Sequence, residues 1–414
     1  MTAVKPLTNK IFWWIAIVLM ALNLLNLLAW TAGNYVHPAL FGLTFLTIFA
    51  VWRQSNTWVL LALTAMFFMI ILGSSIIAWD ARSIWFFHGK RIFIDSNLYS
   101  QLDKYPGWSH ADYPVLVPAL AASVASAFGF WNEALPRIAV VIAVIPGLVL
   151  FAWMYNRAIL FNLWSSAILV IGGNMLLNGY MDAILAIYCA AASLILIEIY
   201  RHLTVKSAIQ EPQWRLQISF ALVLSHILFL KNEGLLAALM LWICWLPQFY
   251  WRSARIVGSQ LFVSLLPFLF YFFVWKLPLI KNGISGDTFL PGILLRLFAF
   301  LQNTSQMLEL AATFASVCGI YVALLAISFA FAIRHRFALS LLPSAVFITG
   351  YWTALLCIYM ITPHGLSWIL LTTADRTWMT ANLSVVSLAL YVFGRIFFND
   401  KLNVLTQKSN LELA

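Results

Sequence analysis

The sequence predicts an all-α membrane protein that crosses the bilayer many times. Of its 414 residues, 63% are hydrophobic and only 9% are charged, which is more apolar surface than a soluble protein of this length can bury. The apolar residues form runs close to the roughly 17–25 residues that a helix needs to cross about 30 Å of hydrocarbon. Helices are favoured over a barrel because lipid offers no partners for backbone amides and the alternation of barrel strands is missing.

Twelve apolar runs are candidate transmembrane helices. Several are short, so we expect about twelve spans within a range of roughly ten to thirteen. The chain shows no soluble domain, no Gly/Ser linker and no repeat of fixed period, which predicts a single transmembrane domain over residues 1–400. The runs are 11–30, 38–52, 58–78, 137–155, 159–174, 180–200, 216–230, 235–250, 259–277, 308–333, 338–361 and 377–398.

Basic residues predict the orientation of these spans, because short loops rich in Lys and Arg usually stay in the cytoplasm. With Lys5 and Lys10 inside, both termini and the tail 401–414 are cytoplasmic, and residues 79–136 form the first outer loop. We therefore expect a multi-pass protein of the inner (cytoplasmic) membrane. The same assignment puts these basic residues inside: Arg53, Arg157, Arg201, Lys206, Arg215, Arg252, Arg255, Arg334, Arg336, Arg395 and Lys401.

The first outer loop is itself amphipathic. Residues 81–94 mix large apolar side chains with basic ones, and residues 113–130 are apolar again, with Pro114 and Pro118 interrupting their start. Trp and long basic side chains are favourable where bilayer and water meet. We expect both segments to be interfacial helices at the outer surface.

Several kinds of function are excluded by composition and motif. The four cysteines (Cys189, Cys244, Cys318 and Cys357) lie inside apolar runs without CxxC spacing, so they are expected to be buried residues and not disulfides or metal ligands. The net charge of +10 comes from basic residues spread singly between spans, which argues against binding to nucleic acid. The GxxxxGK[ST], GxSxG, HExxH and DxD patterns are absent.

Asp80 is the leading candidate for a functional residue. It directly follows the apolar stretch 60–79, and a carboxylate at a membrane boundary costs solvation energy, so it is a functional candidate. Asp is also a favoured N-cap, so Asp80 could cap the helix that follows it. The two roles are compatible.

The predicted topology gathers further ionisable groups on the side of Asp80, which predicts a polar cavity that opens outward. Each has a structural alternative: His110–Pro114 could be a turn, Lys231–Gly234 a solvated hairpin, and Asp375–Arg376 a surface pair. His110 and Asp112 could bind a divalent cation, but two ligands are too few to predict a cofactor. The group comprises Asp80, Arg82, Lys90, Asp112, Asp182, Lys231, Glu233, Asp375 and Arg376.

The order of these motifs resembles the GT-C glycosyltransferases, which are integral membrane enzymes that use polyprenyl-phosphate sugars. The likeness lies in Trp79-Asp80-Ala81 with Trp85, the basic segment after it, and Asp112-Tyr113-Pro114 with Pro118, and it extends over about residues 58–380. The stretches 231–234 and 362–376 add to it. Members that transfer aminoarabinose or mannose often have an acidic pair where Ala81 follows Asp80, and many carry a carboxy-terminal soluble domain, so the sugar and acceptor are not carried over.

The resemblance implies a GT-C-like helix bundle with its active site at the outer, periplasmic face. It implies that Asp80 is the general base, and that an inverting reaction moves a sugar from a polyprenyl-phosphate donor to a glycan or glycolipid acceptor. The donor phosphate would be bound by Arg376, Lys231, Lys90 and Arg82, with Arg376 the first choice because guanidinium pairs with phosphate in a bidentate fork. Supporting polar residues would be His110, Asp112, Tyr113, Asp182, Glu233 and Asp375.

A secondary transporter or lipid-linked-sugar flippase is the alternative function, and an assembly subunit without chemistry is a third. Transporters usually hold substrate near the bilayer midplane and show internal repeats. The acids of this chain are predicted to lie toward one face, and no repeat is apparent, so the sequence favours the enzyme.

Overall fold

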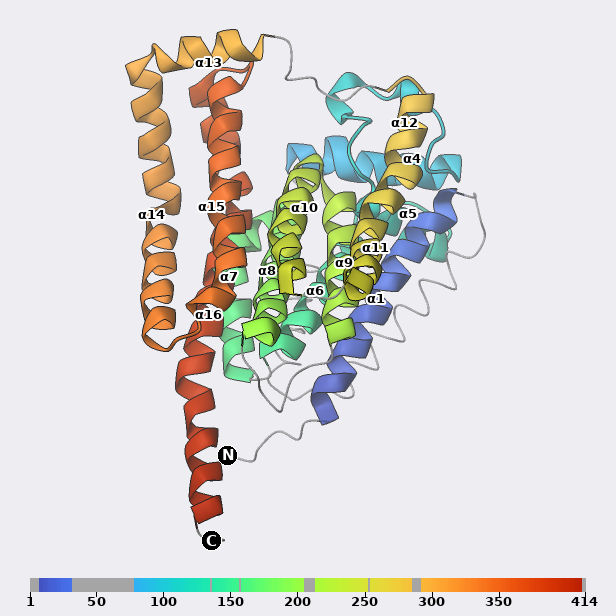
Figure 1. Ribbon diagram of the computed structural model, residues 1–414. Helices are drawn as coiled ribbons and strands as arrows, with labels where there is room; N and C mark the ends of the chain where they lie inside the picture. The colour runs from blue at the N-terminus through green and yellow to red at the C-terminus, as the bar shows by residue number, and fades with distance from the viewer. Residues whose placement is uncertain are drawn as a thin grey trace.

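The computed structural model describes residues 7–31, 78–134, 136–155, 158–204, 213–251, 254–284 and 292–411. Throughout these ranges the chain forms helices joined by turns, and no β-strand is present in them. The prediction of an all-α protein is therefore confirmed for the described chain. The start of α1 and the end of α16 lie at the same end of the bundle, at the bottom of Figure 1.

Nine of the described helices are long and apolar enough to cross a membrane, which confirms a polytopic helical membrane protein. They correspond to nine of the twelve predicted runs. The run 38–52 and nearly all of 58–78 lie outside the described residues. The run 235–250 forms the fourteen-residue helix α10 (Asn232–Trp245) followed by the 3-10 segment η4 (Leu246–Trp251). The count of twelve spans stays a prediction.

The long helices have the following bounds: α1 Leu7–Thr31, α6 Pro136–Tyr155, α7 Ala158–Asn178, α8 Met181–Thr204, α9 Gln213–Leu230, α11 Ala254–Tyr271, α14 Thr304–Arg334, α15 Ala338–Ile361 and α16 Leu366–Leu411. Helix α11 continues through the π-helical turn η5 (Phe272–Lys276) into α12 (Leu277–Lys281).

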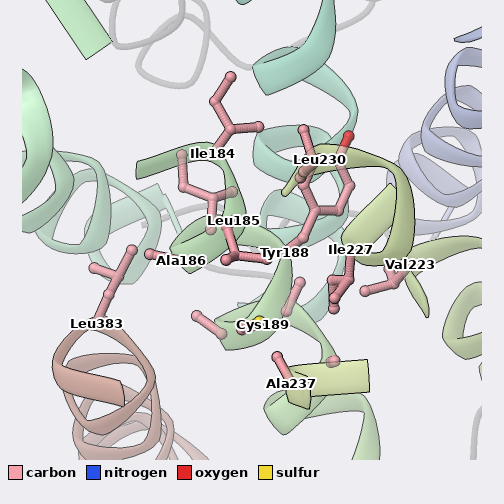
Figure 2. Packing of buried hydrophobic residues seen from close by; sticks show 14 of the residues in the cluster. Ile184, Leu185, Ala186, Tyr188, Cys189, Val223, Ile227, Leu230, Ala237 and Leu383 are labelled. Carbon is pink, nitrogen blue, oxygen red and sulfur yellow. The ribbon is translucent and has the colours of Figure 1, made fainter. Parts of the chain in front are cut away.

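Helix α8 is the centre of the bundle and is buried along almost its whole length. Its side chains Leu185, Tyr188 and Cys189 meet residues of α9, α10 and α16, and Figure 2 shows this packing with Ile227 and Leu383 among the labelled neighbours. Small residues along α8 let the surrounding helices approach closely. By contrast, α11 and α14 expose many apolar side chains, as expected of helices that face lipid.

The segment that we call the first outer loop after its predicted topology, residues 79–136, begins with the π-helical turn η1 (Ala81–Trp85), which runs into α4 (Phe86–Asp95). Together they lie across the ends of the long helices, in blue in Figure 1. Their amphipathic character is as predicted, since Arg82 and Lys90 are exposed while Phe86 is buried.

The second predicted interfacial helix, residues 113–130, differs from the prediction in where it starts and in what surrounds it. It begins after Pro114, as α5 (Leu116–Phe128), with Pro118 in its first turn, and every residue from Leu116 to Ala125 is buried against α1, α4 and α6. Helix α5 is therefore an internal helix of the protein and has no broad face left for lipid. Another short helix, α13 (Ile293–Leu301), lies across the top of α14 in Figure 1 within the predicted outer turn 278–307.

Candidate active site between the first outer loop and helices α8 and α16

Asp80 is joined to Arg376 across nearly 300 residues of sequence. Oδ2 of Asp80 lies 2.6 Å from Nη1 of Arg376, which projects from α16. The guanidinium also lies over the ring of Tyr180, 4.5 Å from its centroid. The carboxylate of Asp80 makes no capping hydrogen bond to η1, so its partner is the cation and not the backbone of the helix it opens.

Lys231 forms a second set of ion pairs beside the first. Its Nζ lies 2.9 Å from Oδ1 of Asp182 and 2.9 Å from Oε1 of Glu233, and the side chains of Lys231 and Asp182 are only 6% and 3% exposed. Burial lowers the pKa of Lys231, but Asp182 and Glu233 outweigh that effect and hold the pKa well above its ordinary value. Lys231 is therefore a fixed positive charge.

The two sets of ion pairs form one group, because Asp182 interacts electrostatically with Arg376 as well as with Lys231. We call Asp80, Asp182, Lys231, Glu233 and Arg376 the Asp80 cluster. They come from four parts of the chain: the start of the first outer loop, the start of α8, the α9–α10 turn and α16.

Asp112 and Tyr113 attach the rest of the outer loop to this group. Asn232 Nδ2 donates to Oδ2 of Asp112 at 2.6 Å, and Trp275 Nε1 donates to its carbonyl oxygen at 3.1 Å. The ring of Tyr113 is stacked against Trp85, with centroids 5.3 Å apart. Burial raises the pKa of the Tyr113 hydroxyl, and nearby Glu233 raises it further.

His110 completes a stack with these rings. The His110 ring is stacked on the ring of Tyr113, with a centroid distance of 4.9 Å and an interplanar angle of 16°. Stacked rings of this kind restrict side-chain rotation. The segment that carries His110, Asp112 and Tyr113 is thus held rigidly next to the Asp80 cluster.

Two glycines explain why the sequence can bring these segments together. Gly179 has φ +79°, and a Cβ there would lie 2.8 Å from the ring of Phe86, so only glycine lets the α7–α8 turn approach the first outer loop. A Cβ on Gly234 would lie 2.0 Å from the carbonyl oxygen of Ile227. The tight α9–α10 turn that carries Lys231 and Glu233 therefore requires glycine.

The Asp80 cluster is incompletely satisfied. Three side-chain atoms of the cluster are buried without a hydrogen-bond partner among the described residues: Asp182 Oδ2, Glu233 Oε2 and Arg376 Nε. The same holds for Oδ1 of the neighbouring Asn232. Buried polar atoms normally have partners, so such a concentration requires an explanation. The cluster offers both a donor and acceptors to a ligand.

Other predicted site residues lie apart from the cluster. Lys90 is at the surface and pairs with Glu133 at 3.3 Å. Asp375 is exposed on α16, on a different side of the helix from Arg376. Arg82 is exposed too and lines an open hollow of about 480 Å³ together with Trp79, Ser83 and Trp108.

Sequence reasoning did not single out Tyr180, Asn232 or Trp275 as site residues. Asn232 lies in the stretch 231–234 that the sequence marked, and Tyr180 lies two residues before Asp182, but Trp275 carries no local signal. In the described parts of the chain, no three His, Cys, Asp or Glu side chains are grouped so as to hold a metal ion.

A second group of charges, which is partly buried, lies at the opposite end of α8 and α16, and we call Glu198, Arg201, Tyr391 and Arg395 the Glu198 cluster. Arg201 donates to Oε2 of Glu198 at 2.6 and 2.8 Å, and the Tyr391 hydroxyl donates to Oε1 at 2.6 Å. Arg395 lies 3.9 Å from the same carboxylate and donates to Tyr391. At 1.5 Å per residue the two clusters are about 24 Å apart along α8 and about 28 Å along α16, close to the roughly 30 Å of a hydrocarbon core.

No protein-family model, no curated protein and no solved structure matches this chain. The likeness to GT-C glycosyltransferases therefore depends on the sequence motifs alone. Any inference about function has to start from the chemistry of the Asp80 cluster.

Proposed function

We propose that this chain is an inverting glycosyltransferase of the inner membrane that works at the outer, periplasmic face. It would move a sugar from a polyprenyl-phosphate donor to a hydroxyl of a glycan or glycolipid. The observation that supports this best is the Asp80–Arg376 pair. It places a carboxylate that can accept a proton beside a guanidinium that can bind a phosphate.

Asp80 is the general base in this proposal. The acceptor oxygen attacks the anomeric carbon, the bond from that carbon to the donor phosphate oxygen breaks, and the proton of the acceptor hydroxyl passes to Asp80. Polyprenyl phosphate leaves with the electron pair. Attack from the side opposite to the leaving group inverts the anomeric centre. A positioned base typically contributes about 10²–10⁴-fold to such a step.

Arg376 binds the donor phosphate. Its Nε is buried and has no partner in the described part of the chain, although Nη1 is bonded to Asp80. Phosphate oxygens are suited to the planar fork of a guanidinium and would compete with the carboxylate for it. Binding of the donor would then weaken the hold of Arg376 on Asp80 and leave the base free for the acceptor.

Lys231 contributes a fixed charge beside the phosphate. Its two short contacts with Asp182 and Glu233 hold the ammonium in place before any substrate arrives. Preorganised cations stabilise the charge that grows on a leaving phosphate, because they need no rearrangement during the reaction.

The alternative, a secondary transporter or flippase, is less well supported. Transporters usually place their substrate groups near the middle of the membrane. Asp182 is the second residue of α8, so the Asp80 cluster lies at the end of the central helix and not halfway along it.

The proposal is tested with purified protein in nanodiscs, polyprenyl-phosphate sugars as donors and extracted cell-envelope glycans or glycolipids as acceptors. We expect Asp80→Asn to lower transfer about 10²–10⁴-fold while the protein stays folded. The matched control is Asp103→Asn, a change of the same kind at an exposed position of the same loop, which should leave transfer unchanged. Near-normal turnover by Asp80→Asn would remove Asp80 as the base.

A further inference from the structure

The open hollow beside Asp80 has two exposed indoles on its wall. It is lined by Trp79, Arg82, Ser83 and Trp108 and has a volume of about 480 Å³. Trp79 is 54% exposed and Trp108 is 49% exposed, and their ring centroids lie 6.1 Å apart with 63° between the planes. Trp108 is backed by Phe87, at 5.8 Å between centroids, so the wall has aromatic support beneath it.

Arg82 supplies the polar part of the same hollow. It is exposed, and within the described chain its guanidinium makes no hydrogen bond, ion pair or ring contact. Arg91, on the same loop, is instead bonded to Asp95 and Gln101. The hydroxyl of Ser83 is already used, since it donates to the carbonyl oxygen of Trp79 at 2.6 Å. The N–H groups of the Arg82 guanidinium are therefore available to donate hydrogen bonds to a ligand in the hollow.

This combination matches the chemistry of a sugar ring. The C–H groups on one side of a pyranose are weakly positive and pack well on the negative face of an indole. Its hydroxyls accept hydrogen bonds from the five N–H donors of a guanidinium. A mostly apolar wall with few, well-placed polar groups is what small-ligand sites generally have.

The position of Asp80 relates this hollow to the reaction. Trp79, Arg82 and Ser83 line the hollow from the point where the chain enters η1. Asp80 stands between Trp79 and Arg82 in the sequence, and its side chain pairs with Arg376. The short segment that forms the wall of the hollow therefore also carries the carboxylate that is held next to the guanidinium.

We infer that the hollow is the subsite for the acceptor saccharide, with a pyranoside ring packed on Trp79 and Trp108 and hydrogen-bonded to Arg82. The role as acceptor site rests on the proposed function, in which Asp80 must touch the acceptor hydroxyl while the donor phosphate is on the side of Arg376. Arg82 is then assigned to the acceptor and not to the donor phosphate.

Indoles and arginines also gather where a membrane meets water, so phospholipid is the competing occupant. The angle of 63° between the two indoles favours the sugar, because two rings set at an angle follow a compact sugar ring better than a flat membrane surface. The edge-to-face contact of Trp79 with Trp108 gives the wall this angle.

The test measures binding separately from turnover. Full-length protein in nanodiscs is screened on an array of neutral and uronic-acid-containing oligosaccharides, which gives equilibrium binding without any donor. We expect wild type to bind a subset of these saccharides, and Trp108→Ala and Arg82→Gln each to weaken binding about tenfold or more. Trp368→Ala, which removes another exposed indole, from α16, is the matched control and should bind normally.

The outcomes separate this inference from the proposed function. Saccharide binding that Trp108→Ala abolishes, in a protein that transfers no sugar from any polyprenyl-phosphate donor, supports the subsite and contradicts the glycosyltransferase. Transfer whose acceptor KM is unchanged in Trp108→Ala and Arg82→Gln overturns the subsite alone. So does an array on which wild type binds no saccharide, or a photo-crosslinking residue at position 108 that captures phospholipid and no glycan.

Discussion

The Asp80 cluster and the Glu198 cluster lie at opposite ends of the same two parallel helices, yet they are built differently. In the Glu198 cluster both carboxylate oxygens of Glu198 are bonded, and the two cations stand three or four residues from a partner on their own helix. In the Asp80 cluster the partners come from four separate parts of the chain. Buried atoms without partners occur among its residues and not at Glu198.

This difference indicates different purposes. A local, satisfied ion pair can form as soon as the helices form, and it holds α8 against α16 at one membrane boundary. A long-range, unsatisfied group of charges costs desolvation energy that its internal contacts do not fully offset. Perturbed and incompletely paired charges are concentrated at functional sites, which is why the Asp80 cluster and not the Glu198 cluster is the candidate site.

Among the substitutions that test the difference between the two clusters, the loss of Lys231 should have the largest effect on folding stability. Lys231→Met leaves the buried Asp182 and the partly exposed Glu233 without their cation, and an unpaired buried charge typically costs about 3–5 kcal/mol of folding free energy. Unfolding in detergent micelles, followed by heat or denaturant, measures this loss.

The surface pair Lys90–Glu133 provides the matched control for Lys231. Lys90→Met removes a lysine from an exposed ion pair of the first outer loop and should change stability by less than about 1 kcal/mol. A double variant, Lys231→Met with Asp182→Asn, should recover part of the loss because one stranded charge is gone. If Lys231→Met and Lys90→Met were equally stable, the buried ion pairs would not hold the cluster together.

Acid should loosen the loop above the Asp80 cluster before the other end. Burial lowers the pKa of His88 to about 4, although its contact with the Ser109 carbonyl opposes this and nearby His110 adds to it. Because the folded pKa is below the ordinary 6.5, the neutral ring stabilises the fold above pH 6.5. That contribution is lost as pH falls from 6.5 toward 4, about 1.4 kcal/mol of it by pH 5.5 and about 3 kcal/mol in all.

Hydrogen exchange at pH 7.5 and pH 5.5 measures this difference between the two ends. After correction for the intrinsic pH dependence of exchange, amides of residues 86–115 should be less protected at pH 5.5 than at pH 7.5, while those around Glu198 keep their protection. His88→Gln cannot gain a proton, so the extra exchange at low pH should disappear in that variant. Equal loosening of both ends in wild type would contradict a role for His88.

The sequence was sufficient for the helices but not for what surrounds each of them. Of the twelve spans that length and hydropathy predicted, nine correspond to long apolar helices in the described part of the chain. The same reasoning placed residues 113–130 at the lipid surface, whereas α5 is enclosed by α1, α4 and α6. Apolar composition reports that a helix avoids water, and it does not say whether the other solvent is lipid or protein.

The candidate site shows the same division. Topology predicted that Asp182, Lys231, Glu233 and Arg376 would lie on the side of Asp80, and the structure brings these five together. Topology gives the end of a helix at which a residue lies, but not its rotation about the axis. Asp375 therefore shared the prediction with Arg376 but is exposed on another side of α16.

Arg376→Lys tests whether the Asp80 cluster binds phosphate or only holds the loop. Lysine keeps the charge but loses the planar fork, so we expect kcat/KM for the polyprenyl-phosphate donor to fall about 10–100-fold, with little change in stability. Arg395→Lys makes the same exchange in the Glu198 cluster and should leave kcat/KM unchanged. An unchanged donor dependence in Arg376→Lys would assign the phosphate to another residue.

The smallest expected effect is at Glu198, and it decides whether the two ends are independent. Glu198→Gln can still accept the hydrogen bond from Tyr391 but no longer neutralises Arg201 and Arg395, so stability should fall by about 1–2 kcal/mol. Sugar transfer at saturating donor should stay within about twofold of wild type, because the nearest residue of the Asp80 cluster is about 24 Å away along α8. If transfer fell as far as in Arg376→Lys, α8 and α16 would couple the two ends, and the Glu198 cluster would be part of the mechanism.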